Sequence, residues 1–267
     1  MKDEPVTDFP AAGSAQRGAG RGRFRTAKPV ATRTSMAARA GAGKDAMVSV
    51  VMLGASGAVG GAALRRLLAM PEVTRVTLLN RREMDAGAGA AKVVQHVVDV
   101  GEPESYRAHL AGHEAAICTL GVGEPSKTPR AEFTRVDRDM PLAFAAACRA
   151  AGARRFTLLS SVGASAGSRV FYLRSKGELE DGLRGLGFAG LGLFHPSMIL
   201  TPSNRYGATQ AVVLTVWPWL TPLLAGPLRK YRGVRVAVLG AAVAVQAVRG
   251  GAGEAVLEWD DFQRLAG

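Results

Sequence analysis

Short apolar runs alternate with segments of helical periodicity from Val48 onward. Six runs rich in Val, Leu, Ile and Phe predict buried strands, at 48–53, 75–80, 93–98, 115–120, 155–160 and 191–195. Between them, apolar positions recur at helical spacing in 61–70, 103–112, 138–152 and 174–187. Near-continuous apolar strands that alternate with helices are typical of a parallel sheet covered on both faces. The pattern therefore predicts an α/β fold with a doubly wound, Rossmann-type parallel sheet.

The alternation breaks after Pro196. Residues 206–228 contain no Asp, Glu, Lys or Arg, although three prolines interrupt the segment. Three interpretations remain open: a helical subdomain that covers a substrate, an interfacial membrane patch with Trp217 and Trp219 at its rim, or a membrane span. The remaining residues predict strand, helix, strand and helix. We expect a leader at 1–46, a nucleotide-binding domain at 47–200, and a small substrate-covering region at 201–267 that completes the fold.

The first 46 residues differ in composition from the rest. Between Gly13 and Lys44 there are eight Lys or Arg residues and no acid. The segment has no apolar run long enough for a secretory signal, and its composition predicts disorder. It could be an organelle transit peptide, an anion-binding arm, or an extension upstream of a start at Met36 or Met47. We expect a cytoplasmic protein, or an organellar protein if the leader is a transit peptide.

Composition argues against several other classes of function. The net charge is +12, of which the leader contributes +5, and aromatic residues make up only 6% of the chain. Nucleic-acid binding is therefore not expected as the main function. Cys118 and Cys148 lack a CxxC spacing and are expected to be free thiols. The four histidines are scattered, so no metal site is expected.

A glycine-rich turn follows the first predicted strand directly. Gly54, Gly57 and Gly60 have the spacing of a dinucleotide-binding turn, in which backbone N–H groups at a helix N-terminus receive a pyrophosphate. Side chains at these positions would block the turn or the approach of the phosphates. The spacing alone is a weak signal, but its position between a strand and a helix makes it specific. The expected cofactor contacts in this turn are Gly54, Ala55, Ser56, Gly57, Val59 and Gly60.

The end of the second predicted strand indicates which dinucleotide is bound. An NAD-binding protein usually has an acid here for the ribose hydroxyls, whereas this chain has Arg81 and Arg82. Two guanidinium groups would pair with a 2'-phosphate, so NADP(H) is predicted in preference to NAD(H). Solvated arginines at a strand end are the alternative. Further cofactor contacts are predicted at Asp99, after the third strand, and at Leu120 and Gly121, after the fourth.

A tyrosine and a lysine lie one helical turn apart in the sequence "YLRSK". Tyr172 and Lys176 are expected on the same face of a helix. Two serines, Ser160 and Ser161, end the fifth predicted strand shortly before this pair. A chance Tyr-x-x-x-Lys is uncommon in a chain of this composition, and it is less common still behind paired strand-end serines.

Several motifs together resemble one enzyme family. The sequences "GASGAVG", "LLNRRE", "ICTLG", "FTRVDRDM", "FTLLSSVGAS", "FYLRSKGELE" and "LFHPSMIL" occur in the order and spacing of the short-chain dehydrogenase/reductases. They are most similar to the atypical branch that contains the Tat-interacting-protein oxidoreductase and its bacterial relatives. The resemblance extends from residue 48 to about residue 200.

The resemblance implies a role for each matching residue. Tyr172 would donate its phenolic proton to a carbonyl oxygen, and the Lys176 ammonium would lower the pKa of the phenol and hold the nicotinamide ribose. Ser161, favoured over Ser160, would hydrogen-bond the substrate carbonyl. Asp137 matches the position where many relatives have an asparagine that supports the lysine through water.

One further position departs from the family pattern. Many relatives have an arginine after the sixth strand, where this chain has His195. The histidine would either contact the cofactor in place of that arginine or cap the strand.

The sequence thus predicts an NADPH-dependent oxidoreductase that transfers hydride to a carbonyl or quinone-like small molecule. The alternative is a protein that binds NADP(H) as a redox signal, with little turnover, and regulates a partner. The uncharged, tryptophan-containing segment after Pro196 suggests a small apolar substrate and permits peripheral membrane contact. The substrate itself and the oligomeric state are left open.

Overall fold

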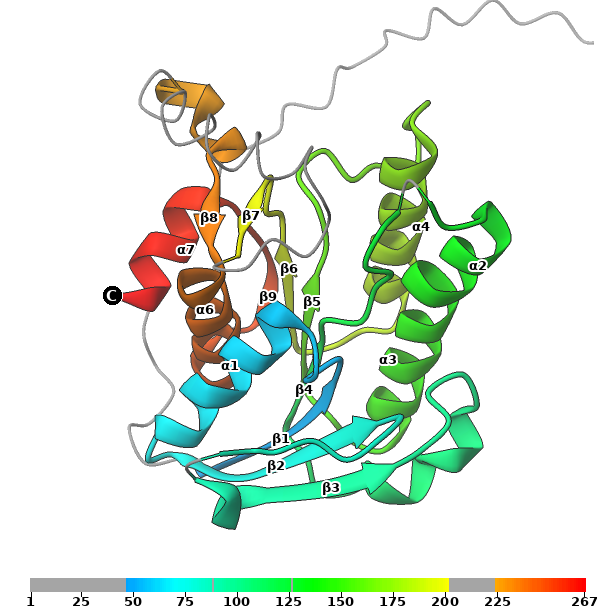
Figure 1. The fold of residues 1–267 in the computed structure, drawn as a ribbon, viewed down its shortest axis with the longest axis vertical. Coiled ribbons are helices and arrows are strands. Elements are labelled where there is room, and N and C mark those ends of the chain that lie inside the picture. The colour runs from blue at the N-terminus through cyan, green and yellow to red at the C-terminus, as the bar shows by residue number, and fades with distance from the viewer. Residues whose placement is uncertain (1–46, 88, 126, 202–223) are drawn as a thin grey trace, which may run out of the picture. The chain divides into compact units, whose positions relative to one another are not determined.

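A seven-stranded parallel sheet forms the centre of the computed structural model (Figure 1). The structure describes residues 47–87, 89–125, 127–201 and 224–267. The leader at 1–46 and most of the uncharged segment 206–228 lie outside these residues, so the interpretations given for them stay predictions. The strand order is β3-β2-β1-β4-β5-β6-β9. The bounds are β1 Val48–Leu53, β2 Val73–Asn80, β3 Val93–Val97, β4 Ala115–Cys118, β5 Arg155–Leu159, β6 Gly190–Phe194 and β9 Gly253–Leu257.

All six strands predicted from the apolar runs are present, with ends that differ by a residue or two. Every residue of β1, β4 and β6 is buried. These strands have helices over both faces, which is why their sequences are continuously apolar and do not alternate. The predicted Rossmann-type α/β fold is confirmed.

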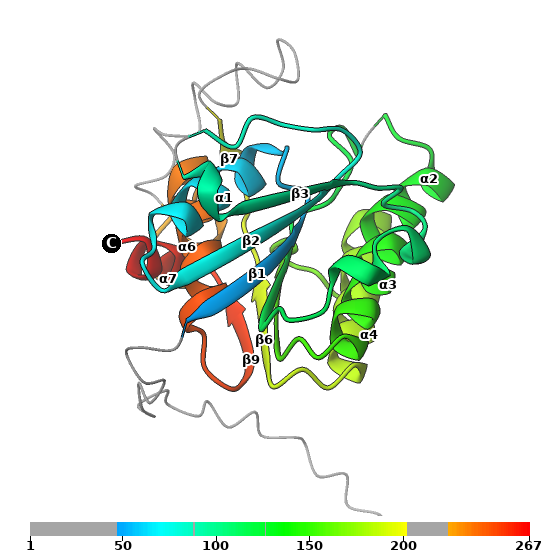
Figure 2. The same cartoon turned by 90° about the horizontal axis from the view of Figure 1, so that it is seen from below.

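Helices cover the two faces of the sheet in separate groups (Figures 1 and 2). On one face lie α1 (Ala58–Ala69), α6 (Val236–Arg249) and α7 (Trp259–Ala266). On the other lie α3 (Met140–Ala150) and α4 (Phe171–Gly185). Each group buries its own apolar core against the sheet, with Leu67, Leu239 and Phe262 in the first and Phe144, Phe156 and Leu183 in the second.

The C-terminal residues belong to this main structure. The predicted order of strand, helix, strand and helix is confirmed by β8 (Val234–Arg235), α6, β9 and α7. Strand β9 pairs in parallel with β6 at the edge of the sheet, and β8 pairs with β7 (Ile199–Leu200) in a separate two-stranded sheet. The substrate-covering role expected for the region 201–267 stays a prediction.

Helix α6 packs closely on α1. A Cβ atom added at Gly240 would overlap the Ala62 side chain and would lie 2.7 Å from the Ala63 backbone nitrogen. The two helices approach this closely because Gly240 has no side chain.

Among the described residues, no helix is both long and apolar enough to cross a membrane.

Two predicted helices differ from the structure. The segment 103–112 forms two short 3-10 helices, η2 (Pro103–Ser105) and η3 (Arg107–His109), and not one α-helix. The break between them places Tyr106 and Leu110 in the core. The helix predicted at 138–152 begins earlier in the structure. Helix α2 (Arg130–Thr134) continues through a π-helical turn, η4 (Arg135–Asp139), into α3. Such π turns are often found at functional sites, and this one carries Asp137.

The strand order reverses between β1 and β4. The chain runs outward from β1 through β2 to β3 and then returns to β4 on the other side of β1. In sheets of this kind, ligands bind outside the carboxyl ends of the strands at this point. The candidate site is therefore expected beside the residues that follow β1 and β4.

Candidate functional site

The glycine turn follows β1 and leads into α1. Gly54 has φ +93°, a conformation that favours glycine, and its carbonyl oxygen accepts hydrogen bonds from the Gly57 N–H at 3.1 Å and the Thr119 hydroxyl at 3.0 Å. A Cβ atom at Gly60 would overlap this carbonyl. The turn is thus held in one conformation that side chains at these two glycines would disrupt.

The N-terminus of α1 is open to an anion. Its first turn contains no acid, and no side chain caps its backbone N–H groups. Unpaired N–H groups and the positive end of the helix dipole together suit a phosphate. Since the turn and this helix end fit a pyrophosphate, the predicted contacts from Gly54 to Gly60 would hold a dinucleotide here.

The residues after β4 lie against this turn. A Cβ atom at Gly54 would be 2.7 Å from the Leu120 backbone nitrogen, and one at Gly121 would be 3.0 Å from Asp137 Oδ1. The structure therefore brings Leu120 and Gly121 between the glycine turn and Asp137. Their contact with a cofactor stays a prediction.

Arg81 and Arg82 directly follow β2 and are exposed. Within the described chain, neither forms an ion pair with a carboxylate. Both guanidinium groups are therefore available to an anionic ligand.

Asp99, two residues beyond β3, is exposed, and its carboxylate accepts the Gly101 N–H at 2.9 Å. That bond closes a turn, and the contact of Asp99 with the cofactor stays a prediction.

Lys176 and Asp137 form a buried ion pair. Lys176 Nζ lies 2.8 Å from Asp137 Oδ1, and the two side chains are 5% and 4% exposed. Asp137 Oδ2 accepts the Val122 N–H at 2.7 Å. Burial alone would lower the pKa of Lys176, but the Asp137 carboxylate, together with Tyr172 and Cys118, raises it above its ordinary value. The ammonium is therefore held charged by a direct contact with Asp137.

Tyr172 lies one turn before Lys176 in α4 and is half-buried. Its ring packs on Phe133, with ring centroids 5.6 Å apart. Its hydroxyl forms no hydrogen bond with any described residue. The phenol is thus oriented by its ring, beside a charged lysine, with its polar end available to a ligand.

The two serines after β5 have different surroundings. The Ser160 hydroxyl is buried and donates a hydrogen bond to Glu180 Oε1. The Ser161 hydroxyl is half-buried and has only a long contact of 3.4 Å with the Val162 carbonyl. Because Ser160 has already used its one proton, Ser161 is the better placed of the two to donate to a substrate.

His195 belongs to the same buried group. Its Nε2 atom lies 2.8 Å from Glu180 Oε1, and its backbone N–H donates to the Leu257 carbonyl of β9 at 2.8 Å. Glu180 also lies 3.5 Å from Arg184 Nη2. Glu180 therefore connects α4 to the residues that follow β5 and β6. A contact between His195 and a cofactor stays a prediction.

Sequence reasoning missed three residues that shape the site. Glu180 follows Lys176 by one helical turn, so the helical spacing that related Tyr172 to Lys176 could have been extended to it. Gly177 allows the 165–166 backbone to cross α4, since a Cβ atom there would overlap Ser165 and Ala166. Gln95 bonds to the residues on either side of Arg81 and Arg82, and its position in a strand gave no signal of this.

Comparisons with known proteins agree with this geometry. Residues 54–185 match the NAD(P)H-binding family model. Protein fmp52, mitochondrial, from Emericella nidulans is 30% identical over 170 residues, which cover 62% of this chain and 73% of that protein. The chain belongs to this NAD(P)H-binding family. The predicted relationship to the atypical short-chain dehydrogenase/reductases is confirmed.

A second relative is more similar in sequence over a shorter span. Protein HTATIP2 from Rattus norvegicus is 38% identical over 153 residues, which cover 57% of this chain and 63% of that protein. The match thus covers less than two thirds of HTATIP2.

Solved structures support the fold. MoeE5 in complex with UDP-glucose and NAD has a TM-score of 0.59 at 18% identity and covers 78% of this chain and 75% of MoeE5. The dTDP-glucose 4,6-dehydratase DesIV from Streptomyces venezuelae, with NAD and DAU bound, has a TM-score of 0.56 at 16% identity, with coverage of 81% and 78%. These similarities show a shared Rossmann-type architecture.

Proposed function

We propose that the protein is an NADPH-dependent reductase of a carbonyl or quinone-like small molecule, with Tyr172 as the proton donor. The observation that carries the proposal is the buried Lys176–Asp137 pair, one helical turn from a tyrosine whose hydroxyl has no partner among the described residues. Membership of the NAD(P)H-binding family supports the cofactor class. When bound, the reduced cofactor supplies a hydride.

Tyr172 would transfer its phenolic proton to the substrate oxygen as negative charge develops there. A positive charge close by favours the phenolate that remains after the transfer. Lys176 carries that charge, and the contact with Asp137 keeps its ammonium protonated at neutral pH. Asp137 is a positioning residue, since it acts on the reaction only through Lys176.

Ser161 would donate a hydrogen bond to the same substrate oxygen. Its hydroxyl has no short hydrogen bond to compete with this role, whereas Ser160 is engaged by Glu180. The preference for NADPH would come from Arg81 and Arg82, which are exposed and lack acidic partners in the described chain.

Binding and turnover are tested separately. Thermal unfolding with saturating NADPH or NADH measures binding, and NADPH should raise the midpoint more. A panel of carbonyl and quinone substrates is then followed by NADPH absorbance for the wild type, Tyr172→Phe and Ser161→Ala. Turnover that falls at least about 100-fold in Tyr172→Phe, with NADPH binding retained, supports the proposal. Cofactor binding with no turnover on any substrate would favour the redox-sensing alternative.

The leader bears on the cellular location of the protein. The fmp52 relatives are named mitochondrial, which is compatible with the organellar alternative. Fusing residues 1–46 to a fluorescent protein in a fungal cell tests this, since the fusion should enter mitochondria if these residues are a transit peptide. A diffuse cytosolic signal would count against it.

A further inference from the structure

The Gln95 side chain forms three hydrogen bonds, one with the last residue of β2 and two with the turn that follows it. Its Oε1 accepts from Asn80 Nδ2 at 3.3 Å and from the Met84 N–H at 3.2 Å, and its Nε2 donates to the Met84 carbonyl at 2.7 Å. Arg81 and Arg82 lie between the two residues that Gln95 contacts. One side chain therefore closes both ends of the turn that carries the two arginines.

The neighbouring strand holds Gln95 in place. Strand β3 pairs in parallel with β2, and Gln95 is in register with Leu78, two residues before Asn80. Asn80 is the last residue of β2 and is 5% exposed. The bonds of Gln95 thus connect a fixed strand to a turn that leaves the sheet.

An amide suits this position better than other polar groups. The N–H and carbonyl of Met84 both need partners, and the amide of Gln95 supplies one acceptor and one donor. A carboxylate supplies no donor and would place a negative charge beside the turn. A leucine of similar size would leave the Met84 groups without their side-chain partner.

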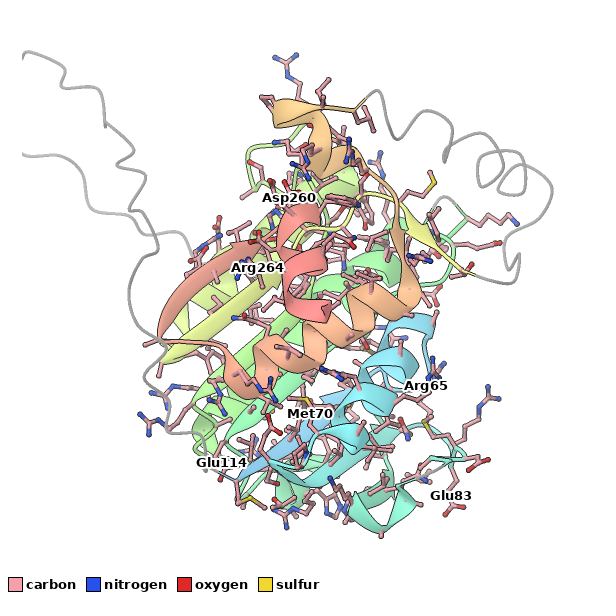
Figure 3. The ribbon with its side chains drawn as sticks, turned by 90° about the vertical axis from the view of Figure 1, so that its left-hand side faces the viewer. Arg65, Met70, Glu83, Glu114, Asp260 and Arg264 are labelled. Atoms are coloured by element: carbon pink, nitrogen blue, oxygen red, sulfur yellow. The ribbon has the colours of Figure 1, made fainter. Side chains whose placement is uncertain are left out.

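The turn after β2 is related in space to helix α1. Figure 3 shows Glu83 of this turn below Arg65, which projects from α1. Arg65 is also exposed, and α1 is the helix whose N-terminus follows the glycine turn. Met84 of this turn packs against the apolar core that contains Leu64, Leu67 and other residues of α1, the helix that is expected to hold the pyrophosphate.

We propose that Gln95 is a positioning residue that determines the preference for NADP(H) over NAD(H). By fixing Asn80 and Met84, it would hold Arg81 and Arg82 in one arrangement before the 2'-phosphate binds, so that less conformational entropy is lost on binding. NAD(H) lacks this phosphate, so its affinity should depend much less on the turn. This inference rests on the proposed NADPH preference.

The test measures dissociation constants for NADPH and NADH by calorimetry, without any substrate. Gln95→Leu is expected to weaken NADPH binding by about tenfold and NADH binding by less than about threefold. Gln95→Glu keeps the two acceptor contacts but loses the donor contact and adds a negative charge, so it should weaken NADPH binding at least as much. It is measured as the second variant if the leucine variant fails to fold. Arg249→Leu, which removes an exposed bond to Glu72 before the start of β2, is the control for a general loss of stability.

The protein without cofactor supplies a second measurement. The Met84 amide should exchange with deuterium faster in Gln95→Leu than in the wild type, because its hydrogen bond to Gln95 is lost. Faster exchange together with a reduced NADPH to NADH affinity ratio supports the inference.

The variant Arg81→Ala/Arg82→Ala separates this inference from the proposed function. If that double variant loses the NADPH preference but Gln95→Leu and Gln95→Glu keep it, the inference about Gln95 is wrong while the proposed preference stands. If the wild type binds NADPH and NADH equally, both are wrong.

Discussion

Glu180 Oε1 lies 2.8 Å from His195 Nε2 and accepts a hydrogen bond from the Ser160 hydroxyl as well. All three residues are buried. They come from α4 and from the ends of β5 and β6, so a single carboxylate oxygen fixes the relative positions of three elements that border the candidate site.

Replacing Glu180 by leucine should destabilise the fold by about 2–3 kcal/mol, because Ser160 and His195 would each lose a buried partner. Glu180→Gln keeps one acceptor and one donor and should cost less, about 1 kcal/mol. Urea unfolding measures both values. Glu178→Gln, on the same helix with a side chain 37% exposed, is the control and should change stability by less than either. Equal losses in the leucine and glutamine variants would contradict a role for these hydrogen bonds.

Removing Lys176 should be costly because it leaves a buried carboxylate unpaired. Lys176→Met is expected to lose about 3–5 kcal/mol of unfolding free energy. The double variant Lys176→Met/Asp137→Asn should be more stable than Lys176→Met alone, since the uncompensated charge is gone. Denaturant unfolding of the two variants makes the comparison. If adding Asp137→Asn lowers the unfolding free energy further, the uncompensated charge of Asp137 is not the cause of the loss in Lys176→Met.

The pH dependence of stability should include a contribution from His113. Burial, and then the nearby Arg75, lower the pKa of His113 from 6.5 to about 4. Its Nδ1 lies 2.6 Å from the Ser49 hydroxyl, which also accepts from Arg75 Nε, so the imidazole is held neutral. Between these two pKa values the unfolded chain binds more protons than the folded chain, so stability falls as pH drops from about 6.5 to 4.

The size of this effect is on the order of 3 kcal/mol at most. His113→Asn keeps an acceptor for Ser49 and removes the titrating group. The difference in unfolding free energy between wild type and variant should therefore shrink as pH falls from 7 to 4.5. A difference that stays constant over this range would show that His113 does not protonate on unfolding.

Two glycines of α4 should respond oppositely to alanine. At Gly177 a Cβ atom would overlap the Ser165 and Ala166 backbone, whereas at Gly185 it would meet nothing within 4 Å. Gly177→Ala should lower the melting temperature and NADPH-dependent turnover, since the 165–166 backbone must move beside Lys176. Gly185→Ala, at the last residue of α4, should be neutral or stabilising by up to about 1 kcal/mol. If Gly177→Ala leaves both the melting temperature and the turnover unchanged, the backbone of residues 165–166 can move away from α4 without cost.

Much of this arrangement follows from local sequence, and the exceptions have physical causes. The strands were predictable because each is buried on both faces, and the positions of Tyr172, Lys176 and the glycine turn follow from spacing within one element. The paired 3-10 helices at 103–109 were not predictable, because burial of Tyr106 in the tertiary structure overrides the helical spacing. Contacts between distant elements, such as Gln95 with Met84 and Glu180 with Ser160, depend on strand order, which periodicity does not give.

The close approach of Gly240 to Ala62 has a practical consequence for dissecting this protein. Helix α6 packs on α1 at Ala62 and Ala63, so the element that presents its N-terminus to a dinucleotide is supported by residues near the end of the chain. A fragment that stops at residue 200 would contain every predicted cofactor contact and yet expose the apolar side of α1. Truncation experiments that aim to isolate a minimal dinucleotide-binding module therefore need to retain α6 and β9.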